Sequence, residues 1–143
     1  MIVFPRNPVE NQWMCDWAAR VIGQEAFERA QAVGVERDGS LIAVAVLHDH
    51  AHPNVMLSWA STGRGWLSRR LLKVVFDWAF NQLKVSRITG LVERPNKRAR
   101  KLNEHLGMKL EGVLRDASPR GKDLFVYGML REEGEALMKR LKI

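Results

Sequence analysis

Cysteine and long apolar runs are scarce in this sequence. Its 143 residues include a single cysteine, Cys15, which excludes an intrachain disulfide and a zinc site built on cysteines. The longest apolar run, residues 41–47, is seven residues long, whereas a helix needs roughly 20 to cross a bilayer. The first residues also lack the basic and then apolar pattern of a signal peptide. We therefore expect a soluble cytoplasmic domain without a membrane partner.

Acidic residues are in the minority. The chain has 23 Lys and Arg residues against 16 Asp and Glu, which gives a formal net charge of +7. This excess favours an anionic partner, such as a phosphorylated small molecule, an acidic protein or a nucleic acid. The length fits one domain, since domains cluster at about 100–150 residues. At 46% hydrophobic residues the chain can build a core, which excludes disorder as its main state. We expect residues 1–143 to form one domain.

The first half of the chain shows both helical and extended patterns. Apolar residues three and four apart over residues 9–32 predict a helix that is interrupted near Gly23 and resumes to about residue 32. The pair Asp38-Gly39 predicts a hairpin between strands at residues 33–37 and 41–47. The second of these strands is apolar on both faces, which indicates a central position in a sheet. Residues 48–54 are predicted as a polar loop and residues 55–60 as the next strand.

The second half contains more amphipathic patterns. They predict helices over residues 66–83 and 131–141, and a further helix that begins at Pro95-Asn96 and ends at Gly107. Strands are predicted at residues 88–92, 109–114 and 123–130. The whole order of elements indicates an α/β or α+β fold, with a mixed sheet flanked by helices.

A glycine-containing turn lies between the strand at residues 55–60 and the helix that follows. Gly63, Arg64 and Gly65 occupy this turn, where free backbone N–H groups and the helix dipole favour an anion. The spacing alone fits an ordinary tight turn equally well. Neither the P-loop pattern nor the dinucleotide-binding pattern is present.

A longer pattern occupies the C-terminal half. Its residues are Asn96, Ala99, Leu102, Leu106, Gly107, Met108, Glu111, Gly112, Arg115, Asp123 and Tyr127. This pattern resembles the GNAT superfamily of acyl-CoA-dependent N-acyltransferases, and in particular the branch of ribosomal-protein N-terminal acetyltransferases. Small acetyltransferase-like proteins of bacteriophages are similar as well. The resemblance extends over about residues 41–133.

The resemblance implies a single GNAT domain whose mostly antiparallel central sheet has two splayed strands that receive acetyl-CoA as cosubstrate. The family's pyrophosphate pattern, [QR]-x-x-G-x-[GA], aligns with residues 62–67 and matches at Gly65, while Leu67 replaces the final small residue. The oxyanion donors are expected on the backbone near Trp59 and Ala60. The implied cofactor-binding residues are Trp59, Ala60, Gly63, Arg64, Gly65, Trp66, Leu67, Asn96 and Ala99.

The implied reaction is direct attack of an amine on the thioester, without a covalent acyl-enzyme. An amine must lose a proton, and the candidate bases are His48, Asp49, His50, His52 and Glu93. Many family members carry a tyrosine near the leaving thiol, where this chain has Asn103. An α-amine, with a pKa of about 7.7–8.0, is easier to deprotonate than a lysine at about 10.4. We therefore expect a protein N-terminus or a small amine as acceptor.

Several features keep more than one interpretation. His48, His50 and His52 alternate in the predicted loop, which fits a solvated loop, a base or a metal site, although we assign no metal. The basic run at residues 97–101 fits a solvated helix face, a contact with CoA phosphates or a contact with RNA. Trp13, Trp17 and Trp78 are predicted to pack in the core, Trp59 and Trp66 to wall the site, and Cys15 to be buried.

The main hypothesis is an N-acetyltransferase that uses acetyl-CoA and an amine acceptor, as a monomer or homodimer. The first alternative is a GNAT-fold binding protein without catalysis, for example a bacteriophage factor that acts on a host protein. An acidic protein partner also fits the charge. A basic module that acts on RNA or aminoacyl-tRNA is the least favoured, because no RNA-recognition motif is present.

Overall fold

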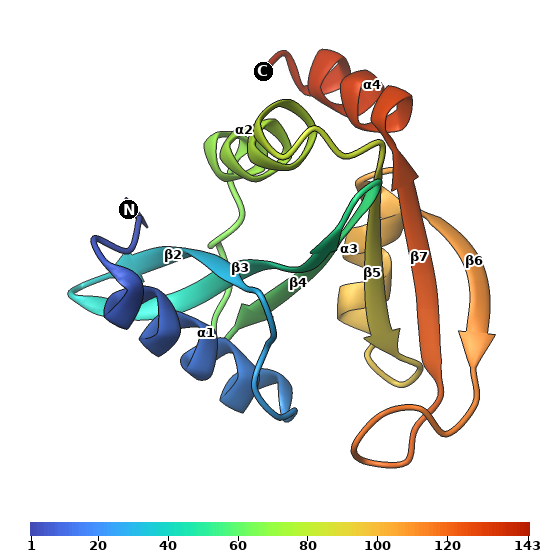
Figure 1. The fold of residues 1–143 in the computed structure, drawn as a ribbon, viewed down its shortest axis with the longest axis horizontal. Helices are drawn as coiled ribbons and strands as arrows, with labels where there is room; N and C mark the ends of the chain where they lie inside the picture. The colour runs from blue at the N-terminus through green and yellow to red at the C-terminus, as the bar shows by residue number, and fades with distance from the viewer.

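A seven-stranded sheet forms the centre of the molecule. The computed structural model describes residues 1–143, and its strands lie side by side in the order β1-β2-β3-β4-β5-β7-β6 (Figure 1). Only β4 and β5 are parallel neighbours, and every other pair is antiparallel. The strands are β1 (Ile2–Val3), β2 (Gln31–Arg37), β3 (Ser40–Ala51), β4 (Asn54–Ser61), β5 (Arg87–Glu93), β6 (Lys109–Leu114) and β7 (Leu124–Leu130).

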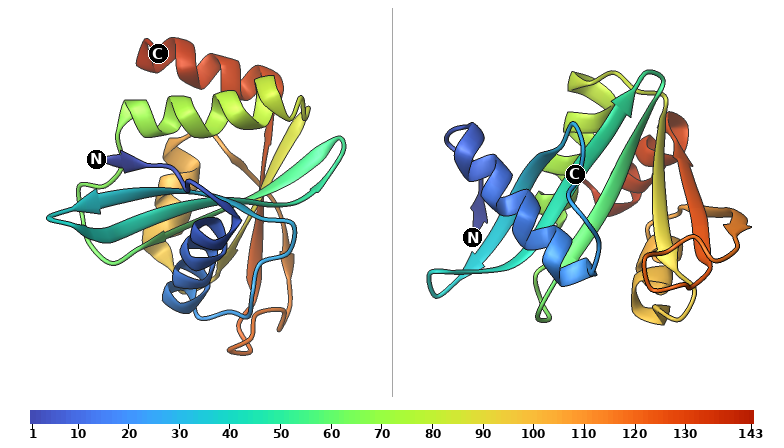
Figure 2. Two further views of the ribbon diagram at one scale, coloured as in Figure 1. Left: turned by 60° about the vertical axis from the view of Figure 1, so that its left-hand side comes forward. Right: turned by 60° about the horizontal axis from the view of Figure 1, so that its bottom comes forward.

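Helices cover the two faces of the sheet unequally. Helix α1 (Pro8–Ile22) packs on β2, β3 and β4, and we call this side the α1 face (Figure 2). The opposite side carries α2 (Arg69–Asp77) with the π-helical turn η1 (Trp78–Gln82), α3 (Lys97–His105) and α4 (Arg131–Leu141). Each face has its own apolar core, and the larger one lies under α2, η1, α3 and α4. The arrangement is the predicted α/β fold with a mostly antiparallel sheet.

The hairpin between β2 and β3 forms as the sequence predicts. Asp38 and Gly39 both adopt left-handed backbone conformations, with φ of 53° and 78°. Two such residues make the turn whose twist matches that of paired strands, and aspartate and glycine are the residues that tolerate it best. The turn pairs Arg37 with Ser40. It therefore sets the register that brings Arg37 to the end of the sheet near the glycine turn.

The first predicted helix is too long. Helix α1 ends at Ile22, where Gly23 caps it with φ of 87°, and the chain then runs into β2 through a segment without regular secondary structure. Asn11 holds this segment to the helix, because its side-chain amide donates to Ala30 O and its Oδ1 accepts from Ala32 N, both at 2.9 Å. These contacts replace the predicted second part of the helix.

The inward face of α1 is also narrower than predicted. Met14, Cys15, Ala18 and Ala19 are buried, which confirms the prediction for Cys15. Trp13 was predicted in the core, but it is 55% exposed. Three of the four buried residues of the helix are small, and the indole is not among them.

Three further boundaries differ from the predictions. The strand β3 continues to Ala51, so residues 48–51 are not a polar loop but part of the sheet. Helix α2 begins at Arg69 instead of residue 66, because Ser68 caps it by accepting from Leu71 N at 3.1 Å. The two-residue strand β1 has no predicted counterpart. By contrast, β6 and α4 have the predicted bounds, and α3 begins after Asn96 as expected.

No helix combines the length and the apolar character that a membrane span requires.

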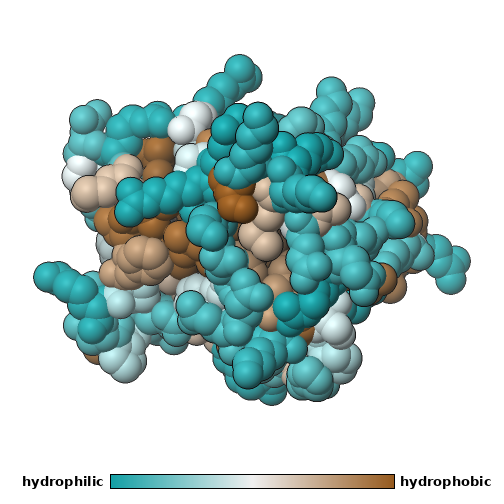
Figure 3. Space-filling model, turned by 90° about the horizontal axis from the view of Figure 1, so that it is seen from above, coloured by the Kyte–Doolittle hydropathy of each residue, from teal (hydrophilic) through white to brown (hydrophobic).

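The outer surface of α2 and α4 is mostly hydrophilic, with hydrophobic residues visible in patches between the charged side chains (Figure 3). Arg69, Arg70 and Lys73 are among the exposed residues of α2.

The packing of α4 on η1 yields a stability prediction. A β-carbon on Gly134 would collide with the ring of Phe80, which is 1% exposed. We expect Gly134→Ala to lower the free energy of unfolding by about 1–3 kcal/mol, the usual cost of overpacking, although alanine favours helices. The measurement is urea denaturation. Glu135→Ala, at an exposed position of the same helix, is the control and should leave stability nearly unchanged. Equal stability of both variants would contradict the packing described here.

Candidate active site

The two parallel strands separate and leave an opening in the sheet. Strands β4 and β5 pair only where residues 54–56 face residues 87–89. Beyond that point β4 continues along β3 to Ser61, and β5 continues along β7 to Glu93. The strands diverge from their shared end in Figure 1. We call this gap in the strand pairing, between residues 57–61 of β4 and residues 90–93 of β5, the opening.

The hydrogen-bond ladder decides which backbone groups face the opening. Thr62 N donates to Ile42 O at 3.0 Å, so the bonded pairs of β3 and β4 include Ala60 with Val44. The intervening residues Trp59 and Ser61 direct their N–H and C=O groups away from β3, toward the opening. These groups form an unpaired strand edge of the kind that accepts a further extended chain. Of the two predicted oxyanion residues, Trp59 therefore faces the opening, and Ala60 is paired with β3.

Asn103 lies at the narrow end of the opening, on the side of α3. A β-carbon placed on Gly90 would lie 3.6 Å from both Asn103 Nδ2 and Leu57 O. Asn103 is only 4% exposed. A carboxamide can donate a hydrogen bond to a sulfur atom but has no proton to release near neutral pH. A side chain of this kind can donate a hydrogen bond but cannot act as a general acid.

The glycine turn follows β4 directly, and a residue that the sequence analysis missed supports it. The guanidinium of Arg37 donates to Arg64 O at 3.2 Å and to Gly65 O at 3.3 Å. Gly65 has φ of 73°, and the space around Gly63 is open. Because Arg37 takes up the carbonyl groups, the turn is left with its N–H groups and the exposed Arg64 side chain for an anion. Only the register of the hairpin brings Arg37 here, so no local signal identifies it.

Two tryptophans lie between the turn and the core. The rings of Trp59 and Trp66 are 5.6 Å apart at 44°, and Leu67 packs beside them against the larger core. Nε1 of Trp59 is buried and has no hydrogen-bond partner. A buried N–H without a partner is costly, and a ligand carbonyl or phosphate oxygen would satisfy it.

The start of α3 holds the predicted asparagine. Oδ1 of Asn96 accepts from Ala99 N at 3.2 Å and caps the helix, and Ala99 packs against the core. The basic run that follows is divided in its roles. Arg100 donates to Arg94 O and lies 4.3 Å above the ring of Phe125, so it stabilises the fold. Lys97, Arg98 and Lys101 are exposed and are free to meet an anion.

His48 is a buried member of β3, on the α1 face. Nδ1 lies 2.7 Å from Oδ2 of Asp49, and Nε2 lies 2.9 Å from Oγ of Ser58. Burial lowers the pKa of His48, against the opposing effect of Asp49. His50 has a buried Nε2 without a partner, and His52 is exposed. The interpretation of the three histidines as a solvated loop is therefore wrong for His48, and no three His, Cys, Asp or Glu side chains are grouped as metal ligands.

Glu93 ends β5 and is already paired. Its carboxylate accepts two hydrogen bonds from Arg120, which lower its pKa. The side chain of Arg120 lies close to the end of α1, 3.9 Å from the position of a β-carbon on Gly23. The loop between β6 and β7 thus meets the end of α1 on the α1 face. A carboxylate held by an arginine is a poorer proton acceptor than a neutral imidazole.

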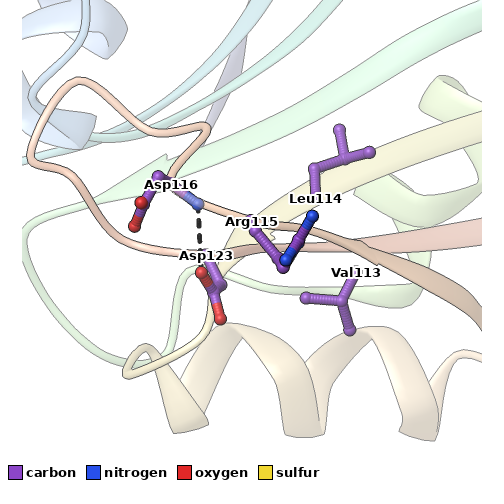
Figure 4. Close-up of a pocket in the computed structure, with 5 residues that line it drawn as sticks. All are labelled: Val113, Leu114, Arg115, Asp116 and Asp123. Atoms are coloured by element: carbon purple, nitrogen blue, oxygen red, sulfur yellow. Dashed lines mark hydrogen bonds between the residues drawn. The ribbon is translucent and has the colours of Figure 1, made fainter.

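A separate hollow of about 710 Å³ lies at the ends of β6 and β7. Figure 4 shows its five lining residues, with Asp116 N donating to Asp123 Oδ1 at 3.0 Å. Val113 and Leu114 point to opposite sides of β6 in this view. The hollow is open, and none of the predicted site residues lines it.

Solved structures with the same fold are acetyltransferases by name. The spermidine/spermine N-acetyltransferase SpeG from Vibrio cholerae has 22% identity and a TM-score of 0.64, over 76% of this chain and 71% of its own. A proposed acetyltransferase from T. thermophilus has 23% identity and a TM-score of 0.70, over 86% and 69%. A dodecameric structure of the Vibrio cholerae enzyme has 23% identity and a TM-score of 0.63, over 73% and 67%. No protein-family model and no curated protein sequence matches the chain. These likenesses define the fold as that of the GNAT acetyltransferases.

Proposed function

We propose that the protein transfers an acetyl group from acetyl-CoA to an amine, by direct attack of the amine in a ternary complex. One observation carries the proposal: β4 and β5 part after three paired residues, and the glycine turn and α2 follow β4 at once. This order sets an unpaired strand edge next to an anion site. The strand edge offers amide partners to the pantetheine arm of CoA, and the anion site offers positive potential to its pyrophosphate.

The residues around the opening fit acetyl-CoA. The backbone of Trp59 and Ser61 would bind the pantetheine amides, and the N–H groups near Gly65 with the side chain of Arg64 would bind the pyrophosphate. The unpartnered Nε1 of Trp59 supports a ligand oxygen on this side of the sheet. When bound, acetyl-CoA supplies the activated acyl carbon, and the chain's own groups position it and take up the proton of the amine.

The proposed acceptor is an amine of low pKa, such as a protein N-terminus or a small amine. Asn103 supplies no proton to the leaving thiol, but a thiol of pKa about 8.5 leaves readily as a thiolate near neutral pH. An α-amine is neutral in a much larger fraction than a lysine at the same pH. Glu93 is paired with Arg120 and Asp49 lies 3.6 Å from Arg29. These two carboxylates are thus partly neutralised and attract a polycation such as spermidine less.

The test measures release of free CoA from acetyl-CoA with three acceptors, namely a peptide with a free α-amine, the same peptide with a blocked N-terminus and an internal lysine, and spermidine. We expect turnover with the free α-amine to exceed that with the lysine peptide by at least about tenfold, from the difference in pKa. Spermidine should be the poorer acceptor. Turnover of none of a broad panel of amines would contradict the proposed function.

A second candidate is a binding protein that holds CoA or an acidic partner without catalysis. Asn103 and the bulky Leu67 favour it, because each departs from the pattern of the active family members. Binding of acetyl-CoA without turnover of any acceptor would support this candidate. The RNA hypothesis instead requires an affinity that falls steeply with salt concentration.

The assay for free CoA detects thiols, so the reactivity of Cys15 matters to it. Burial raises the pKa of this thiol to about 11, so only about one molecule in a thousand carries the thiolate near pH 8. We expect the native protein to leave a thiol-detecting reagent unreacted while the unfolded protein reacts completely. Fast labelling of the native chain would contradict the burial of Cys15. The free thiol detected during turnover should therefore come from CoA.

A further inference from the structure

Three polar side chains form a hydrogen-bonded chain on the α1 face of β3 and β4. His48 joins them, with Ser58 at one ring nitrogen and Asp49 at the other, at 2.9 and 2.7 Å. Nη2 of Arg29 lies 3.6 Å from Oδ1 of Asp49. The ring of Phe27 covers the imidazole, with 4.6 Å between the ring centroids. His48 is therefore enclosed by a ring, a hydroxyl and a carboxylate, and is only 7% exposed.

The partners of His48 assign its tautomer. A carboxylate only accepts hydrogen bonds, so Nδ1 of the neutral imidazole must carry the proton and donate it to Asp49. Nε2 then has a free lone pair and accepts from the hydroxyl of Ser58. The oxygen of Ser58 retains lone pairs of its own, which can accept a hydrogen bond from a further N–H group.

Ser58 is the member of this chain that a substrate reaches first. It is half-buried, whereas His48 is buried. Ser58 directly precedes Trp59, whose backbone faces the opening. Met56 is paired with Thr89. If the same parallel register is extended by two residues, Ser58 lies across the opening from Leu91. An amine that approaches the opening from the α1 face therefore meets the hydroxyl before the imidazole.

We infer that Ser58, His48 and Asp49 form a proton relay that deprotonates the attacking amine. The inference rests on the proposed function. The nitrogen lone pair forms a bond to the thioester carbonyl carbon while the N–H proton passes to Ser58 Oγ and the hydroxyl proton passes to Nε2 of His48. The carbon–sulfur bond then breaks, and its electron pair leaves with the sulfur of CoA. The proton on His48 returns through Ser58 to the thiolate, which restores the starting state.

The charges around His48 agree with this role. Burial lowers its pKa, so the imidazole is neutral near pH 7 and able to accept a proton. Asp49 is the charged group in direct contact with the ring, and Arg29 lies beyond it. Asp49 stabilises the imidazolium that forms after proton transfer, as a carboxylate does in other serine–histidine–aspartate arrangements. Ser58 thus touches the substrate, and Asp49 acts as a positioning residue through His48.

The kinetic test compares Ser58→Ala, His48→Gln and Asp49→Asn with the wild type, using the best acceptor of the panel above. We expect Ser58→Ala to lower kcat by about 100-fold, at the lower end of the usual contribution of proton transfer, with KM for acetyl-CoA nearly unchanged. Asp49→Asn should move the acid limb of the pH profile to lower pH, because the imidazolium loses its partner. Ser40→Ala and His52→Gln, at exposed positions, should leave kcat unchanged. A kcat of Ser58→Ala within about twofold of the wild type would overturn the relay.

Two further measurements keep the relay and the proposed function distinguishable. NMR of the side-chain nitrogens of His48 near pH 7 should show a protonated Nδ1 and a bare Nε2, without any acceptor present, and a proton on Nε2 would overturn the relay. Mass spectrometry after incubation with acetyl-CoA alone should find the chain unmodified, and an acetyl group on Ser58 would overturn direct attack with a relay. Wild-type turnover together with an active Ser58→Ala variant rejects the relay alone, whereas no turnover by the wild type rejects both.

Discussion

Gly65→Glu is expected to weaken the binding of acetyl-CoA by about 100-fold. The substitution adds a negative charge where the proposed pyrophosphate lies, and two unit charges about 4 Å apart repel by about 4 kcal/mol near a protein surface, before screening by salt. Roughly 2.7 kcal/mol of this repulsion already corresponds to a factor of 100 in the dissociation constant. The new carboxylate also lies next to Arg37, whose Nη2 is 3.3 Å from the position of a β-carbon on Gly65. An ion pair between them would draw Arg37 away from the carbonyl groups of the turn.

The control for this prediction is Gly107→Glu. Gly107 has φ of 91° and open space around it, so the change introduces the same charge and a similar backbone strain at the end of α3. Calorimetric titration with acetyl-CoA should give the wild-type affinity for Gly107→Glu and a much weaker one for Gly65→Glu. Equal affinities of the two variants would show that the glycine turn does not hold the phosphates.

The free energy of unfolding should decrease as the pH is lowered below about 6.5, the ordinary pKa of histidine. The group responsible is His48. Burial lowers the pKa of His48 in the native state, so the unfolded chain takes up this proton first as the pH falls. The contribution of His48 to stability is therefore fully present above the unfolded pKa and is lost progressively below it, through the native pKa. The free energy of unfolding should change by at most about 1.4 kcal/mol per pH unit for this one proton.

Urea denaturation between about pH 7.5 and pH 5 measures this effect. His48→Gln should flatten the dependence of the unfolding free energy on pH, and His52→Gln, at an exposed turn position, should leave it as in the wild type. An unchanged slope in His48→Gln would contradict the burial of a neutral imidazole in β3. The test needs neither acetyl-CoA nor an acceptor, so its result is independent of the proposed function.

Local chemistry accounts for the parts of the fold that the sequence predicts well. Asp38 and Gly39 specify a two-residue hairpin, and Asn96 with Gly107 specify both ends of α3. The end of α1 depends instead on the contacts of Asn11 with the segment before β2, which are distant in sequence. The start of α2 had a readable signal, because Ser68 is a typical helix cap. The apolar Trp66 and Leu67 before it extended the predicted helix.

The candidate site is predictable only in part, because contacts between residues distant in sequence decide much of its geometry. The resemblance to acyl-CoA-dependent transferases pointed to the glycine turn and to Asn103, and the roles of these residues stay predictions. Arg37 reaches the turn through the hairpin register, and Ser58 meets His48 through the register of β3 with β4. Such cross-strand contacts leave no pattern in the sequence of either strand. The roles of the basic residues at 97–101 are also not readable from the sequence, since only the fold shows that Arg100 lies over Phe125.

Under the proposed function, acetyl-CoA binds as an added strand against the unpaired edge of β4. Amide hydrogen exchange at single-residue resolution tests it most directly, with and without saturating acetyl-CoA. We expect the amides of Trp59 and Ser61, which face the opening, to become protected when the ligand binds. The amide of Ala60, already paired with Val44, should change much less. Unchanged exchange at Trp59 and Ser61 under saturating ligand would rule out binding along this edge of β4.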